Sequence, residues 1–201
     1  HYNTDLFCFL ILIYAVLYYG GLYQPPIYKT FGQTFFFILI IYLFILKIIL
    51  KRSIHPLIFV GGYLVLAGWT LYTSPHPLVD TITVFKEAPQ MILHGKNPYD
   101  SFFSPVYANI KSNYYNHFPL SFIFYIPFSL LSFDGRIGLL MATIASFIFI
   151  YKLIQSKLKQ EAILPLSLIL FMPGSFYMLE HMYSETIIFF LFSLAIFILT
   201  I

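Results

Sequence analysis

The feature that most limits the fold of this chain is a series of apolar runs with almost no charge inside them. The 201 residues are 60% hydrophobic, 21% aromatic and 9% charged, whereas about a quarter of the residues are charged in an ordinary soluble domain. Several runs approach the roughly 20 residues that an α-helix needs to cross a bilayer. We therefore predict an all-α integral membrane protein, because a transmembrane barrel would show weakly alternating strands of about 10 residues instead.

The apolar runs predict one transmembrane domain over residues 1–201 with six spans. The expected spans are residues 6–19, 34–49, 56–72, 137–154, 162–178 and 186–201. The first residue is His and the last run is cut short, so we expect an N-terminal fragment of a longer protein. Cys8, the single cysteine, lies in the first run and is expected to be a small buried apolar side chain.

Basic residues in the loops orient these spans. Lys47, Lys51 and Arg52 form the densest early basic cluster, and by the positive-inside rule the loop that carries them is cytoplasmic. The long loop at residues 74–133 then emerges on the non-cytoplasmic side. The protein is thus expected in the cell membrane, or in the endoplasmic reticulum of a eukaryote, with its active site on the non-cytoplasmic face.

The apolar run at residues 118–133 does not fit a simple alternation of spans. If it crossed, the basic loop at residues 152–159 would fall on the non-cytoplasmic side, against the positive-inside rule. The run is short and contains Pro119 and Pro127, and proline kinks a helix by removing a backbone donor. We expect this run to lie along the interface or to re-enter, within a loop of juxtamembrane helices.

Residues 78–93 have the spacing of an amphipathic helix. Apolar side chains recur on one stripe, formed by Leu78, Ile82, Phe85, Ala88 or Pro89, and Ile92. This pattern predicts a helix on the bilayer surface with its polar face toward water. Gly95 is expected to end that helix, because glycine is common just past a helix terminus, and a turn follows at residues 96–100.

Three acids reach one side of the membrane by this topology. Asp80 stands at the head of the surface helix, and Glu180 and Glu185 lie in a short loop between the last two spans. Placing a carboxylate in so apolar a setting costs free energy, so acids at such positions suggest a function by default. We predict that Asp80, Glu180 and Glu185 are catalytic. A helix cap at Asp80 and solubilising loop charges at the two glutamates are the structural alternatives.

Polar residues near these acids are candidates for substrate contacts. They are Lys86, Glu87, Lys96, Asn97, Tyr99, His117 and His181. Residues like Lys86 and Glu87 more often form only the water-facing side of a helix on the membrane surface. Tyr99 is explained equally well by a loop at the membrane interface, where tyrosine is common.

The acids and histidines of this region could also bind a metal ion, because they are typical metal ligands. Carboxylate and imidazole groups bind divalent cations, so a divalent metal at Asp80 with Glu180, His181 or Glu185 stays an open alternative. No tight ligand spacing supports it, and no cofactor is certain. The formal net charge of +3 comes from loop lysines, so no nucleic acid is expected as a partner.

An acid after a span is followed here by an amphipathic helix, a Gly-Lys-Asn-Pro-Tyr turn and a His-Phe-Pro-Leu segment. Over roughly residues 70–190 this order resembles the GT-C superfamily of integral-membrane glycosyltransferases. Asp80 matches the acid of the first non-cytoplasmic loop, residues 95–99 match the turn, and Glu180 or Glu185 matches a later polar position. The chain departs from many relatives in having three expected spans before the acid instead of one.

The resemblance implies transfer of a sugar, mannose first, from a polyprenyl-phosphate donor to a hydroxyl of a lipid or glycan acceptor. Asp80 would take the acceptor proton, and Lys86, Lys96 or Lys111 would face the leaving phosphate. The spans would form a groove for the prenyl chain among membrane lipids. A transporter, which would place charge near the span centres, and a non-enzymatic membrane scaffold are the alternatives.

Overall fold

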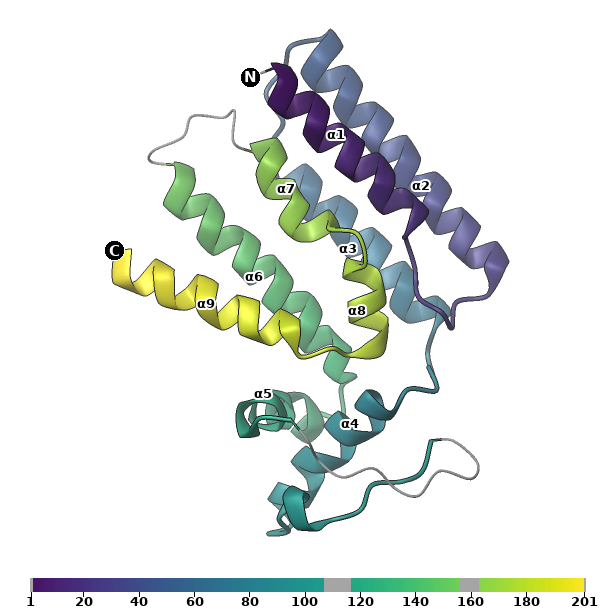
Figure 1. Ribbon diagram of the computed structural model, residues 1–201, viewed down its shortest axis with the longest axis vertical. Helices are drawn as coiled ribbons and strands as arrows, with labels where there is room; N and C mark the ends of the chain where they lie inside the picture. The colour runs from purple at the N-terminus through teal and green to yellow at the C-terminus, as the bar shows by residue number, and fades with distance from the viewer. Residues whose placement is uncertain (1, 107–116, 156–162, 201) are drawn as a thin grey trace.

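The protein is all-helical in the computed structural model, which describes residues 2–106, 117–155 and 163–200 (Figure 1). The described residues contain no strand, so the all-α prediction is confirmed for them. Lys111 and residues 156–159 of the basic loop lie outside the described residues. Among the described residues, four helical segments are long and apolar enough to cross a membrane: Pro26–Ile49, Pro56–Thr73, Gly135–Gln155 and Ile163–His181.

Two groups of helices make up the described chain. The bundle consists of α1 (Tyr2–Leu17), α2 (Pro26–Phe44) with a π-helical end at Ile45–Ile49, α3 (Pro56–Thr73), α6 (Gly135–Gln155), α7 (Ile163–Phe171), α8 (Ser175–His181) and α9 (Glu185–Thr200). The second group is α4 (Asp80–Leu93), a 3-10 turn at Pro98–Asp100 and α5 (Pro119–Leu130). Figure 1 shows α4 and α5 beneath the bundle, at the end where α3 finishes and α6 begins.

Packed aromatic rings form the centre of the bundle. Phe36 of α2 contacts Phe171 of α7 at a centroid distance of 5.2 Å, and Tyr63 of α3 contacts Phe176 of α8 at 5.6 Å. All four are almost fully buried, and each buried aromatic side chain removes 150–250 Å² from solvent, with ring pairs worth about 1 kcal/mol beyond that. Cys8 is buried in the same core, as expected.

Helix α2, a candidate membrane span, starts earlier than the predicted boundary at residue 34. It begins at Pro26, which occupies the first helical turn after Pro25, because a proline there loses no helical hydrogen bond. Within it, Gly32 lies against Tyr19, which follows α1: a Cβ on this glycine would be 2.0 Å from Cε1 of Tyr19. The Tyr19 hydroxyl in turn donates to the carbonyl of Leu66 (3.0 Å), which joins the connection after α1 to α3.

The predicted span at residues 162–178 is broken in the structure. Between α7 and α8 lie Met172, Pro173 and Gly174, and Gly174 has a positive φ of 89°. Proline cannot continue the helical hydrogen bonds, and glycine adopts the left-handed conformation at no cost. The part of the predicted span after the break is α8, which continues to His181. Glu180 and His181 therefore lie on a helix, and the prediction that they lie in a loop is wrong. Met182, with φ of 59°, caps that helix.

Helix α4 lies within the predicted residues 78–93, but the predicted apolar stripe is only partly correct. Phe85, Ala88 and Pro89 are buried as expected and Val84 is buried as well, whereas Leu78 and Ile92 are exposed. Helix α4 packs against α5, where Phe85 contacts Tyr125 at a centroid distance of 5.0 Å, and α5 in turn packs against α6. Gly95 has a φ of 71°, and the backbone N–H of Lys96 donates to the carbonyl of Met91, so the helix ends where predicted. Helix α5 has 12 residues and is about 18 Å long, well short of the roughly 30 Å of a bilayer core.

The ends of the bundle differ in charge. Lys47, Lys51 and Arg52 precede α3 and Lys152 is near the end of α6, all at the end away from α4 (Figure 1). Asp80 begins α4 and Glu185 begins α9, at the other end.

Candidate functional site

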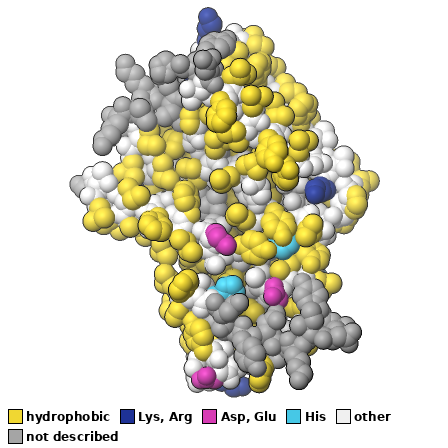
Figure 2. Space-filling view, viewed as in Figure 1, with side chains coloured by type: hydrophobic (Ala, Val, Ile, Leu, Met, Phe, Trp, Pro, Cys, Tyr) yellow, Lys and Arg dark blue, Asp and Glu magenta, His cyan; other side chains and the backbone are white. Residues whose placement is uncertain are grey.

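Two acids from distant parts of the chain share one environment where the bundle meets α4. Asp80 lies in the first turn of α4 and Glu185 in the first turn of α9. Both carboxylates act electrostatically on the same two groups, the imidazole of His117 and the hydroxyl of Tyr183. Figure 2 shows acidic and histidine side chains gathered on one face, between the apolar helices above and the level of α4 and α5 below.

The first helical turn accounts for the placement of these acids. Unpaired N–H groups give a helix N-terminus a partial positive charge, which stabilises a carboxylate by about 0.3–1 kcal/mol. Asp80 is not the helix cap itself, since Val79 holds that position, and its Oδ1 accepts from the backbone N–H of Thr81 (2.8 Å). The N-cap alternative is therefore wrong in detail, although a favourable interaction with the helix dipole remains.

The Asn-Pro-Tyr turn positions His117. Asn97 is engaged within the turn, where its Oδ1 accepts from the N–H of Tyr99 (3.1 Å) and its Nδ2 donates to Asp100 (2.6 Å). The Tyr99 hydroxyl donates to the backbone carbonyl of His117 (2.8 Å). The imidazole lies against the ring of Phe85 at a centroid distance of 4.6 Å. The turn thus holds the backbone of a histidine on which both acids act electrostatically.

Tyrosine rings surround His181 at the same end of the bundle. Tyr177 lies at a centroid distance of 3.9 Å, and Tyr23 and Tyr183 each lie at 5.6 Å. The Nδ1 of His181 is 2.9 Å from the carbonyl of Tyr177, and its own carbonyl accepts from the Thr81 hydroxyl on α4. These contacts place His181 and its tyrosines next to the start of α4.

Glu180 differs from the other two predicted catalytic acids because it is fully buried, with 0% exposure. Its Oε2 accepts weakly from the N–H of Tyr23 (3.4 Å) and lies 3.5 Å from Nδ1 of His181, while Oε1 has no hydrogen-bond partner. The carboxylate packs onto Gly21, where a Cβ would be 1.5 Å from Oε2. The structure therefore removes Glu180 from the open part of the site and makes it a contact between α8 and the α1–α2 turn.

The remaining predicted contact residues lie along α4 and after it. Glu87 accepts from the backbone N–H of Ser104 (3.0 Å) and so holds the segment after the 3-10 turn. Lys86 and Lys96 are exposed, and among the described residues no contact joins them to Asp80 or Glu185.

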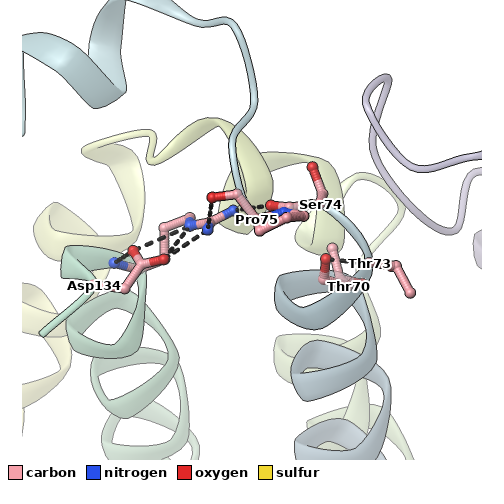
Figure 3. A network of polar contacts seen from close by, with 6 residues as sticks. Thr70, Thr73, Ser74, Pro75 and Asp134 are labelled. Carbon is pink, nitrogen blue, oxygen red and sulfur yellow. Dashed lines mark hydrogen bonds and ion pairs between the residues drawn. The ribbon is translucent and has the colours of Figure 1, made fainter.

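A buried arginine at the same end was missed by the sequence analysis. Arg136, 2% exposed, pairs with Asp134 and donates to the carbonyls of Ser74 (2.7 Å) and Pro75 (3.3 Å). Figure 3 shows this network between the start of α6 and the residues that follow α3. The sequence feature that indicates it is Asp134-Gly135-Arg136 at the start of an apolar run, because a charged side chain in an apolar setting needs a partner of opposite charge. Tyr177 and Tyr183 flank the His181 segment and were also missed.

The electrostatics of the site follow from burial and from the two acids. Burial lowers the pKa of His117, while the negative charges of Asp80 and Glu185 act in the opposite direction. The hydrogen bond with Tyr177, burial and the same acids raise the pKa of Tyr183 to about 12. At neutral pH the site therefore holds a neutral imidazole and a protonated tyrosine. No group of three or more His, Cys, Asp or Glu side chains is placed to hold a metal ion within the described parts of the chain.

We expect the lowered pKa of His117 to make the protein less stable in acid. The unfolded chain binds a proton at the ordinary value of 6.5 and the folded protein only at a lower pH, so stability falls as pH drops below 6.5 and the loss is complete below the folded pKa. Among the described residues, Phe85 lies against the imidazole and Asp80 and Glu185 act on it electrostatically. We would measure the Tm of the wild type and of His117→Gln between about pH 7.5 and pH 5. The Tm of the wild type should fall by more over this range. Plots of Tm against pH that run parallel for the two proteins would contradict this expectation. His94→Gln is the control for loss of an imidazole ring, because His94 is exposed.

No family model, no curated protein and no solved structure matches this chain. The side chains of the site are therefore what points to a function.

Proposed function

We propose that the protein is a GT-C type glycosyltransferase that moves a sugar, mannose first, from a polyprenyl-phosphate donor to a hydroxyl group. The observation that carries the proposal is that Asp80 and Glu185, at the starts of two helices, both act electrostatically on His117 and Tyr183. Two carboxylates with tyrosine and histidine rings form a surface that hydrogen-bonds hydroxyls and stacks against sugar rings. The resemblance of the segment from Asp80 to residue 120 to GT-C enzymes supports the same reaction.

The charge of the site favours the acceptor over the donor phosphate. Asp80 and Glu185 repel an anion, and the two rings nearest them are uncharged at neutral pH. A hydroxyl, in contrast, donates readily to a carboxylate. We therefore assign the acceptor to this cluster, with Asp80 as the base that takes the hydroxyl proton while the acceptor oxygen bonds to the anomeric carbon and the sugar–phosphate bond breaks.

A groove between α2 and α3 suits the hydrocarbon tail of such a donor. It has a volume of about 380 Å³ and is lined by Phe31, Phe35, Val65, Gly68, Trp69 and Tyr72, among others. Trp69 donates from its indole to the carbonyl of Tyr28 (2.9 Å), which joins its two walls. The groove reaches Tyr72 near the end of α3, the same end from which the chain continues to Asp80.

Transfer from defined donors tests this proposal. Purified protein in lipid nanodiscs would be incubated with polyprenyl-phosphate mannose or glucose carrying a labelled sugar, together with a mixture of lipid and glycan acceptors. We expect label to move from the lipid to a hydroxyl product, with mannose preferred. Transfer that is equal in Asp80→Asn protein, or absent with every donor, would count against the proposal.

The broken helix gives one observation in favour of a transporter instead. Discontinuous helices in the membrane commonly frame a substrate site in transporters, and α7 and α8 are separated by Met172–Gly174 within one apolar segment. Proteoliposome uptake of labelled sugars distinguishes the two functions, because a transporter moves the sugar without forming a glycosidic bond.

A further inference from the structure

The segment that leads into Asp80 is held by three separate parts of the fold. After α3, the carbonyls of Ser74 and Pro75 accept from Arg136 at the start of α6 (2.7 and 3.3 Å). Four residues beyond Ser74, the carbonyl of Leu78 accepts from the Tyr23 hydroxyl of the α1–α2 turn (2.6 Å). One residue after Asp80, the Thr81 hydroxyl donates to the carbonyl of His181 on α8.

These contacts matter because, within the part of the chain that the structure describes, α4 makes few other contacts with the bundle helices. Its main packing is against α5 and the 3-10 turn, and α5 is the helix that packs on α6. The start of α4 would therefore be free to shift relative to α9, and Asp80 relative to Glu185, if the segment were not fixed. A carboxylate that must accept a proton needs its partner within hydrogen-bond reach.

Tyr23 is the central member of this arrangement. Its hydroxyl holds Leu78, its backbone N–H donates to Glu180, and its ring lies against His181. Glu180, buried and unable to reach a substrate, thereby gains a role in fixing the turn that carries Tyr23. Arg136 acts at the other end of the segment, where Asp134 neutralises its charge (Figure 3).

We propose that Tyr23, Thr81 and Arg136 are positioning residues that hold Asp80 in register with Glu185 and His117. This inference rests on the proposed function for its meaning in catalysis, but the geometry it asserts is independent of any substrate. None of the three touches the reacting atoms in this account, and each acts through the backbone on either side of Asp80.

Two conservative variants test the proposal. Tyr23→Phe removes one hydroxyl and keeps the ring, and Thr81→Val keeps the shape of the side chain. Arg136 is a poorer target, because loss of its guanidinium leaves Asp134 and two carbonyls without their donor and would destabilise the fold. Tyr42→Phe and Thr34→Val are matched controls, since Tyr42 is exposed and lies outside the groove between α2 and α3, and the Thr34 hydroxyl donates within its own helix.

The first measurement follows His117 by NMR with labelled histidine in nanodiscs, and the His117→Gln protein assigns its signal. Asp80→Asn should lower the pKa of His117, because the negative charge of Asp80 raises it. Tyr23→Phe and Thr81→Val, and more so the double variant, should shift the pKa in the same direction by a smaller amount, while the controls leave it at the wild-type value. An unchanged pKa in the double variant, or in Asp80→Asn itself, would overturn the proposal.

The second measurement is sugar transfer. We expect kcat to fall about 10- to 100-fold in the double variant with little change in KM, because a displacement of about 1 Å is enough for such a loss. Wild-type protein that shows the NMR pattern but transfers no sugar would refute the proposed function and leave the positioning role standing. A double variant with wild-type kcat would refute the positioning role alone.

Discussion

Asp80→Asn is expected to abolish most of the sugar transfer while leaving the fold intact. Loss of a general base lowers kcat by about 10²- to 10⁴-fold, and asparagine cannot take a proton from a hydroxyl. Its side-chain oxygen can still accept the hydrogen bond from the N–H of Thr81, so the first turn of α4 keeps its contact. The measurement is kcat and KM with the labelled donor, alongside thermal unfolding of the same preparation.

Controls separate this effect from a general loss of negative charge. Asp5→Asn makes the same change at the opposite end of the bundle, where the carboxylate lies 3.9 Å from Lys47, and should leave kcat at the wild-type value. Glu185→Gln should lower kcat by less than Asp80→Asn if Glu185 only orients the acceptor. A folded Asp80→Asn protein that turns over normally would remove Asp80 from the reaction.

The second large effect is expected at Gly21, on stability. A Cβ there would lie 1.5 Å from Oε2 and 1.8 Å from Cδ of Glu180, so Gly21→Ala forces a buried carboxylate out of its place. Overpacking a buried site costs about 1–3 kcal/mol, and displacing a charged group from its partners adds to that. We expect a loss of about 3 kcal/mol or more, measured as a lower Tm in nanodiscs, or failure to accumulate in the membrane.

A double-mutant cycle identifies the cause of this loss. Glu180→Ala removes the carboxylate that the new methyl group meets, so Gly21→Ala should cost far less in that background, and the two changes should be strongly non-additive. Gly61→Ala is the matched control, since nothing lies within 4 Å of its added Cβ, and alanine in a helix interior is favoured over glycine by about 1 kcal/mol. Additive losses in the cycle would show that the carboxylate does not occupy the space beside Gly21.

The sequence predicted the helix that begins at Asp80 more accurately than it predicted the helix boundaries around the site. The helix from Asp80 to Leu93 and its end at Gly95 follow from periodicity and from a single glycine, which are properties of neighbouring residues. The break at Met172–Gly174 carried an equally local signal, Pro173 followed by Gly174, and was overlooked because the apolar run continues through it. The boundary of α2 was placed too late because Thr30, Gly32 and Gln33 interrupt the apolar run without interrupting the helix.

The sequence by itself determined that the chain is helical and apolar and that acids lie at the ends of its helices, because composition and spacing are local quantities. Only the tertiary structure decided which acids share an environment. In the folded protein Asp80 and Glu185 both act electrostatically on His117, and Glu180 is buried against Gly21. The Tyr99 hydroxyl donates a hydrogen bond to the backbone of His117. These contacts depend on how helices far apart in the chain pack, and the spacing of residues along one helix carries no information about the helix beside it.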